Sequence, residues 1–188
     1  MMKYKILMPA LLCLITSGCL FMSEPFKPIN YYDLGKTPEP AGLETPARIA
    51  GVKMSGPYKS SMVFRLKPNE LTMNDYNKWA QTPETLVKSY LTAFMGQSLR
   101  SEGDATLLNA NILAFEADLL TDKPEAVLTV EWTVAPPQGA GKSMSGGIKS
   151  YRTEMKDKTP ACFAEAMTIS VAKFAEELLA NIRTANKK

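Results

Sequence analysis

Two runs of alternating apolar residues, joined by a short connection, constrain the fold more than any other part of the sequence. The apolar members are Leu113, Phe115, Ala117 and Leu119 in the first run, and Ala126, Leu128, Val130, Trp132 and Val134 in the second. A period of two is the signature of a strand with one buried face, and the connection 121–124 contains Pro124. The region 110–133 is therefore predicted to form an antiparallel hairpin. Glu116 and Asp118 are expected on its solvated face, opposite positions such as Thr129 and Glu131, where acid–base chemistry is disfavoured.

Two helices are predicted, and each begins at a Thr-Pro pair. Thr82 and Thr159 suit the N-cap, and the prolines that follow suit the first helical position. In the first helix Leu86, Val87, Tyr90, Leu91 and Phe94 recur at helical spacing, and Gly96 or Gly103 ends the segment. In the second helix one apolar stripe contains Phe163, Met167, Val171, Phe174, Leu178 and Ile182. We expect this stripe to pack on a sheet, because the opposite face mixes acids with lysines, unlike a membrane-surface helix.

Further short strands are predicted at 30–35, 47–54, 61–66 and 143–154, with an irregularity at Ala50-Gly51. Residues 75–80 are interpreted as an aromatic-bearing connection. The predicted fold is α+β: one domain, 30–186, with a mostly antiparallel sheet and two helices packed on one face.

The amino terminus looks like a bacterial lipoprotein signal. Lys3 and Lys5 precede an apolar stretch, 6–15, which is too short to span a bilayer. Ser17 and Gly18 then lead into Cys19, although Thr16 stands where leucine is usual. We expect residues 1–18 to be a cleaved signal peptide, and residues 19–29 to be a lipidated cysteine and tether, with acyl chains such as palmitate. The alternative is an ordinary secretory signal in which Cys19 is incidental.

The amino-acid composition excludes several classes of function. The chain has 188 residues and no histidine, which excludes Ser-His-Asp and Cys-His catalysis. Loss of Lys3 and Lys5 with the leader leaves 20 basic and 19 acidic residues, so no nucleic-acid-binding footprint is expected. Cys162 would be the only unmodified cysteine, so no intramolecular disulfide is predicted. We expect no metal and no cofactor, and a small carboxylate-based hydrolase is the least favoured function.

Several motifs invite a functional interpretation. Gly139–Ser143 ends like a phosphate-binding loop, but Pro136 replaces the glycine that such a loop requires, which favours a hairpin loop. Arg65 must face away from Phe64 and Leu66 within its strand, where it could form an ion pair or cover an edge. Tyr58, Tyr76 and Trp79 could line a groove or pack under a loop. Arg65, Tyr76 and Trp79 are the candidate partner or groove contacts.

The order and spacing of several segments resemble a known family. The segments are Tyr31–Gly35, Ile49–Val52, Met62–Leu66, Asn69–Leu71, Tyr76–Pro83, Phe115–Asp118, Ala126–Leu128 and the closing helix. On these residues the chain resembles the ABC-type transport auxiliary lipoproteins, which include intermembrane transport lipoproteins of the PqiC type. None of the segments is a catalytic motif.

The resemblance implies a periplasmic, non-catalytic lipoprotein that works beside an MCE-domain protein and an inner-membrane ABC-type assembly, moving lipids between membranes. It also implies that such proteins can form homo-oligomeric rings. Leu20, which follows Cys19, favours the outer membrane over the inner membrane in many Gram-negative bacteria. The alternative is a structural lipoprotein that supports assembly of an outer-membrane barrel or of lipopolysaccharide.

Overall fold

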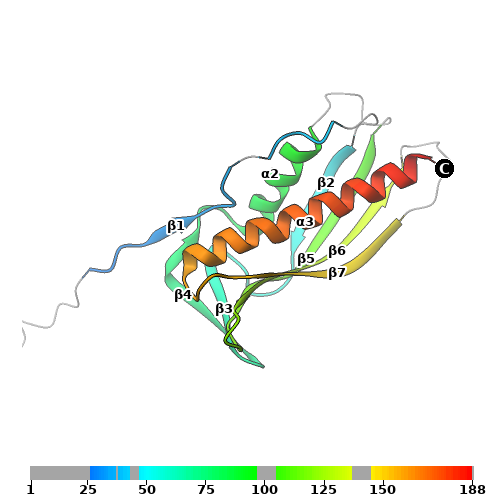
Figure 1. Ribbon diagram of the computed structural model, residues 1–188. Helices are drawn as coiled ribbons and strands as arrows, with labels where there is room; N and C mark the ends of the chain where they lie inside the picture. Colours follow the sequence, from blue (N-terminus) through cyan, green and yellow to red (C-terminus); the bar gives the residue numbers. More distant parts are fainter. Residues whose placement is uncertain (1–25, 37, 43–46, 97–104, 137–144, 188) are drawn as a thin grey trace, which may run out of the picture.

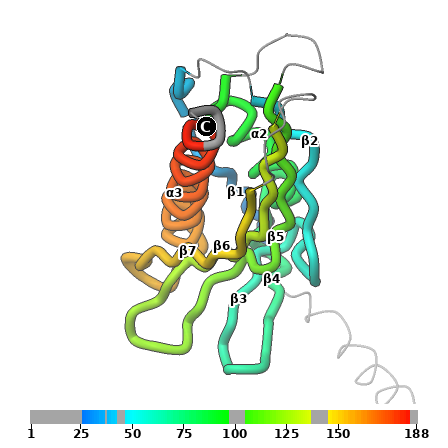
Figure 2. The backbone as a smooth tube through the Cα atoms, turned by 90° about the vertical axis from the view of Figure 1, so that its right-hand side faces the viewer, coloured from blue at the N-terminus to red at the C-terminus, as the bar shows by residue number. Residues whose placement is uncertain are grey.

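The computed structural model describes residues 26–36, 38–42, 47–96, 105–136 and 145–187. The strands are β1 (Asn30–Tyr32), β2 (Ala47–Met54), β3 (Ser61–Lys67), β4 (Glu70–Trp79), β5 (Thr106–Asp118), β6 (Glu125–Ala135) and β7 (Ser145–Glu154). The helices are α2 (Pro83–Met95) and α3 (Pro160–Lys187). Both helices lie over the same face of one sheet, and the long α3 runs along β6 and β7 (Figures 1 and 2). The predicted α+β class is confirmed.

The sheet has seven strands in the order β1-β4-β3-β5-β6-β7, with β2 beside β5. The pairs β3–β4, β5–β6 and β6–β7 are antiparallel, whereas β1–β4, β2–β5 and β3–β5 are parallel. The sheet is therefore mixed, with more parallel pairing than the sequence suggests. β5 is its centre: β6 follows one edge throughout, while β2 and then β3 occupy successive parts of the other edge.

The helix boundaries follow local signals. Before α2, Thr82 is extended and Pro83 occupies the first turn, while Gly96 ends the helix at φ 59° in the left-handed region. Glycine adopts this backbone conformation without the steric penalty that a side chain brings. At α3, the Thr159 hydroxyl accepts a hydrogen bond from the Cys162 amide at 3.3 Å, as an N-cap does. The Thr82 hydroxyl instead bonds to Thr85 at 2.9 Å and makes no cap to the backbone.

The core lies between the helices and the sheet. Every member of the predicted α3 stripe is fully buried. Phe163 packs edge-on against Trp79 with ring centroids 5.3 Å apart, and Trp79 packs against Phe115 at 5.1 Å. Further along the helix, Phe174 packs against Trp132 at 5.9 Å. One aromatic-rich cluster thus joins α3 to strands from both halves of the sheet.

Two predicted element boundaries are wrong. Residues 70–79 form the single strand β4, where a connection was expected over 75–80, and β5 begins at Thr106 instead of near Ala110. Within β4 the Asn74 side-chain oxygen accepts hydrogen bonds from the amides of Tyr76 and Asn77, at 3.0 and 2.9 Å. The pairing with β3 is irregular at the same place, and this interruption hides the strand's alternation. The irregularity predicted at Ala50-Gly51 of β2 is confirmed.

Some predictions concern residues outside the described part of the chain. They are the signal peptide 1–18, Cys19 with the first part of the tether, and the loop that contains Gly139–Ser143. Neither helix in the described ranges combines the length and hydrophobicity that crossing a bilayer requires.

Candidate functional site

A charged cluster is buried on the sheet face opposite the helices. Glu116 of β5 is 3% exposed, and its two carboxylate oxygens have separate donors. Arg65 Nε of β3 donates to Oε1 at 2.6 Å, and the Tyr58 hydroxyl donates to Oε2 at 2.5 Å. Arg65 Nη1 also donates to the Pro68 carbonyl at 2.9 Å. The cluster therefore joins β5, β3 and the segment between β2 and β3.

This arrangement corrects the sequence prediction for the two acids. Glu116 and Asp118 do share a face, but Glu116 is covered by Tyr58 instead of being solvated. Their cross-strand partners are Val127 and Glu125, not Thr129 and Glu131. Asp118 bonds to Arg152 at 3.2 Å, and Arg152 also bonds to Glu125, so Glu116 and Asp118 are paired with different cations. The geometry thus favours two structural ion pairs over an acid–base pair, because both oxygens of Glu116 already accept hydrogen bonds.

The cluster perturbs the titration of its members. Burial, and then the hydrogen bond to Glu116, raise the pKa of the Tyr58 phenol well above its usual range. The hydrogen bond to Glu116 also raises the pKa of the Arg65 guanidinium. At physiological pH the guanidinium is charged and the phenol is neutral even without these shifts, and both shifts favour the same states. We therefore interpret the cluster as a clamp that fixes the segment 55–60 on the sheet.

The three candidate contact residues lie in different environments. Arg65 faces away from Phe64, as predicted, and pairs with Glu116. Trp79 is 1% exposed, so its place is the core and not a partner-facing surface. Tyr76 is exposed on β4, and Lys27 Nζ lies 5.4 Å from the centroid of its ring. Of the three, Tyr76 is the most exposed, at 42%, and is the one best placed to contact a partner.

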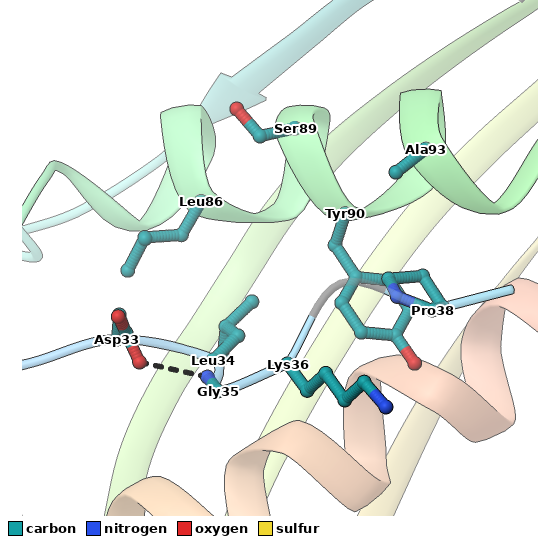
Figure 3. A pocket seen from close by; sticks show the side chains of 9 residues that line it. All are labelled: Asp33, Leu34, Gly35, Lys36, Pro38, Leu86, Ser89, Tyr90 and Ala93. Atoms are coloured by element: carbon teal, nitrogen blue, oxygen red, sulfur yellow. Dashed lines mark hydrogen bonds between the residues drawn. The ribbon is translucent and has the colours of Figure 1, made fainter.

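A hollow lies between α2 and the segment that follows β1 (Figure 3). Its volume is about 160 Å³, below the roughly 300 Å³ of the smallest usual ligand pockets. Leu34, Leu86 and Tyr90 line it, together with Asp33, Gly35, Lys36, Pro38, Ser89 and Ala93. The Asp33 carboxylate accepts a hydrogen bond from the Gly35 amide at 2.8 Å, so part of its capacity to accept hydrogen bonds from a ligand is already used. The hollow suits one short apolar group better than a whole small molecule.

Two other hollows are larger but more polar. One, of about 350 Å³, lies over β2, β5 and β6 and includes Lys53, Asn109 and Glu131. The other, of about 330 Å³, lies between β1 and the start of α3. Among the described residues, no group of three or more His, Cys, Asp or Glu side chains is placed to hold a metal ion.

Solved structures share this fold. A crystal structure of an uncharacterized protein matches with a TM-score of 0.68 and 15% sequence identity, covering 82% of this chain and 99% of that chain. The crystal structure of protein XCC0632 from Xanthomonas campestris, assigned to the family DUF330, matches with a TM-score of 0.63 and 17% identity. It covers 80% of this chain and 92% of that chain. At such low identity these matches show the fold alone, and no curated protein sequence matches the chain.

The family comparison is more specific than the structural one. The model of the ABC-type transport auxiliary lipoprotein component matches residues 48–178, which include β2 through most of α3. The matched range contains the Tyr58–Arg65–Glu116 cluster and the aromatic core. The chain therefore belongs to the family of ABC-type transport auxiliary lipoprotein components.

Proposed function

We propose that this protein is a non-catalytic auxiliary component of an MCE-type intermembrane lipid transport system, held at the periplasmic face of the outer membrane by acyl chains on Cys19. The family match over residues 48–178 carries the proposal, since it supports a transport-associated lipoprotein. The sequence around Cys19 supplies the attachment chemistry: its thiol can form a thioether, and Ser17 and Gly18 allow a peptidase close approach.

The described surface agrees with a role in binding rather than catalysis. The most buried carboxylate, Glu116, is engaged by Arg65 and Tyr58. The apolar hollow beside α2 is small and the two larger hollows are more polar, so the domain is better suited to contact other components than to enclose a lipid. The proposed partners are an MCE-domain periplasmic protein and its inner-membrane assembly, with a homo-oligomeric ring as the arrangement that would meet them.

The anchor is tested by fractionation and mass spectrometry. We expect Cys19→Ala to release the protein from membranes and to remove the diacylglyceryl mass from the mature chain, because two or three acyl chains are needed for durable attachment. Cys162→Ala is the matched control, since Cys162 is the other cysteine that the mature chain would keep. A Cys19→Ala variant that stays membrane-bound would contradict the anchor.

The partner is tested by affinity purification from cell envelopes. We expect an MCE-domain protein to co-purify with the acylated wild-type chain. Recovery of an outer-membrane barrel or of lipopolysaccharide assembly proteins, without an MCE-domain protein, would instead support the structural alternative.

A further inference from the structure

The chain that leads from Cys19 enters the fold along β4. Asn30, Tyr31 and Tyr32 pair in parallel with Asn77, Lys78 and Trp79. The Ala80 amide donates to the Tyr32 carbonyl at 2.7 Å, and Leu34 is buried. Lys27 lies over the ring of Tyr76. The tether predicted over residues 19–29 thus leads directly into β1, and its residue Lys27 already contacts β4.

Exposed apolar side chains gather along this path. Phe26 is 92% exposed, and Ile29 and Tyr31 follow it in the same segment. Met73 and Tyr76 are exposed on β4. We call these five residues the anchor-side surface. The other exposed large apolar side chains of the described residues are spread over the rest of the fold: Leu66 near the end of β3, Leu113 in β5, Leu120 in the β5–β6 turn, Ile148 in β7 and Ile169 in α3.

The length of chain between Cys19 and Phe26 limits what this surface can reach. Seven residues span at most about 25 Å when fully extended. By comparison, α3 has 28 residues and is roughly 42 Å long. Figure 1 shows β1, β3 and β4 at the end where the described chain begins, and α3 runs from there to the opposite end. An acyl anchor on Cys19 would therefore keep β1 and β4 next to the bilayer.

We propose that the anchor-side surface rests on the lipid bilayer that holds Cys19, an inference that depends on the proposed acylation. Phe26 and Met73 supply apolar contacts to the acyl chains. Tyr31 and Tyr76 have the amphipathic rings that favour the headgroup region of a membrane. Lys27 and Lys78, which lie beside them, offer ammonium groups to lipid phosphates. Anchor and surface together fix the orientation, so the C-terminal end of α3 faces away from the membrane.

The test places a reporter on the surface of the full acylated protein. Met73→Trp introduces an exposed indole on β4, while Ile148→Trp on β7 and Ile169→Trp on α3 are matched controls at exposed sites elsewhere. Each variant is reconstituted into phosphatidylcholine–phosphatidylglycerol vesicles whose acyl chains are brominated, or into unbrominated vesicles. The unsubstituted protein gives the background, since its Trp79 and Trp132 are buried.

We expect brominated lipid to quench the added emission of Met73→Trp, and to leave that of Ile148→Trp and Ile169→Trp nearly unchanged. Equal quenching at all three positions, or none at Met73→Trp, would overturn the inference. Acrylamide quenching of the Met73→Trp emission can also be measured on vesicles. If acrylamide still reaches this indole on vesicles and loses access only when a purified partner protein binds, the inference is overturned and the surface is assigned to protein contact. Flotation with the vesicles is measured separately. A protein that floats but shows no quenching would support the Cys19 anchor and overturn the contact between the anchor-side surface and the bilayer. A protein that carries no lipid and does not float would contradict both proposals.

Discussion

Removal of the Arg65 cation should destabilise the fold by leaving Glu116 buried without its charged partner. Breaking a buried ion pair from one side costs about 3–5 kcal/mol. The Arg65 side chain is 26% exposed and that of Glu116 is 4% exposed, so water can reach part of the vacated site. We therefore expect Arg65→Met to lower the free energy of unfolding by about 2–3 kcal/mol. For a domain of this size the melting temperature should fall by roughly 4–12 °C.

The matched control is Lys67→Met, which removes a cation two residues further along β3. Lys67 pairs with Glu70 at 2.6 Å, but these side chains are 70% and 48% exposed. An exposed pair of this kind contributes at most about 1 kcal/mol. Urea denaturation, followed by the emission of the buried Trp79 and Trp132, measures both variants.

A double-mutant cycle with Glu116→Gln separates the charge interaction from the hydrogen bond that Arg65 donates to the Pro68 carbonyl. We expect a coupling energy above about 1 kcal/mol between Arg65 and Glu116, because they are in direct contact. A cost for Arg65→Met no greater than for Lys67→Met, or a coupling energy near zero, would refute the clamp interpretation.

Three further predictions concern titration, a close backbone approach and the core. The raised pKa of Tyr58 means that its contribution to stability is complete below the unfolded-state pKa near 10 and is lost as pH rises above it. Tyr58→Phe should be less stable at pH 7 by about 1–2 kcal/mol and should lose less stability between pH 9 and 11 than the wild type, as urea midpoints would show. Gly146→Ala would place a Cβ 2.4 Å from a carbonyl oxygen of β6, so thermal unfolding should reveal a loss of about 1–3 kcal/mol that Ser145→Ala does not cause. Phe163→Ala should cost about 3–5 kcal/mol in chemical denaturation, against less than about 1 kcal/mol for Ile169→Ala on the exposed side of α3.

The sequence determined the elements whose signals are local. Pro83 marked the start of α2, and Gly96 and Gly103 were the two candidate ends, of which the structure selects Gly96. The stripe from Phe163 to Ile182 predicted which face of α3 is buried. The hairpin of β5 and β6 followed from its alternation and its short connection, but the register shift between Ile112 and Ala114 leaves Leu113 exposed, where the alternation predicted it on the buried face. These patterns succeed because neighbours three or four residues apart on a helix, or two apart on a strand, share a face whatever the rest of the chain does.

Only the tertiary structure decided which strands pair and what covers each face. The parallel contact of β3 with β5 joins residues more than fifty positions apart, and no periodicity records such a partner. Alternation placed Glu116 on the face opposite the core, but it could not show that Tyr58 would cover that face. The interpretation of residues 75–80 as a connection left Trp79 as a groove candidate, although the side chain lies against Phe115 and Phe163. The physical reason is that burial depends on which distant segments meet, whereas side-chain direction depends only on the local backbone.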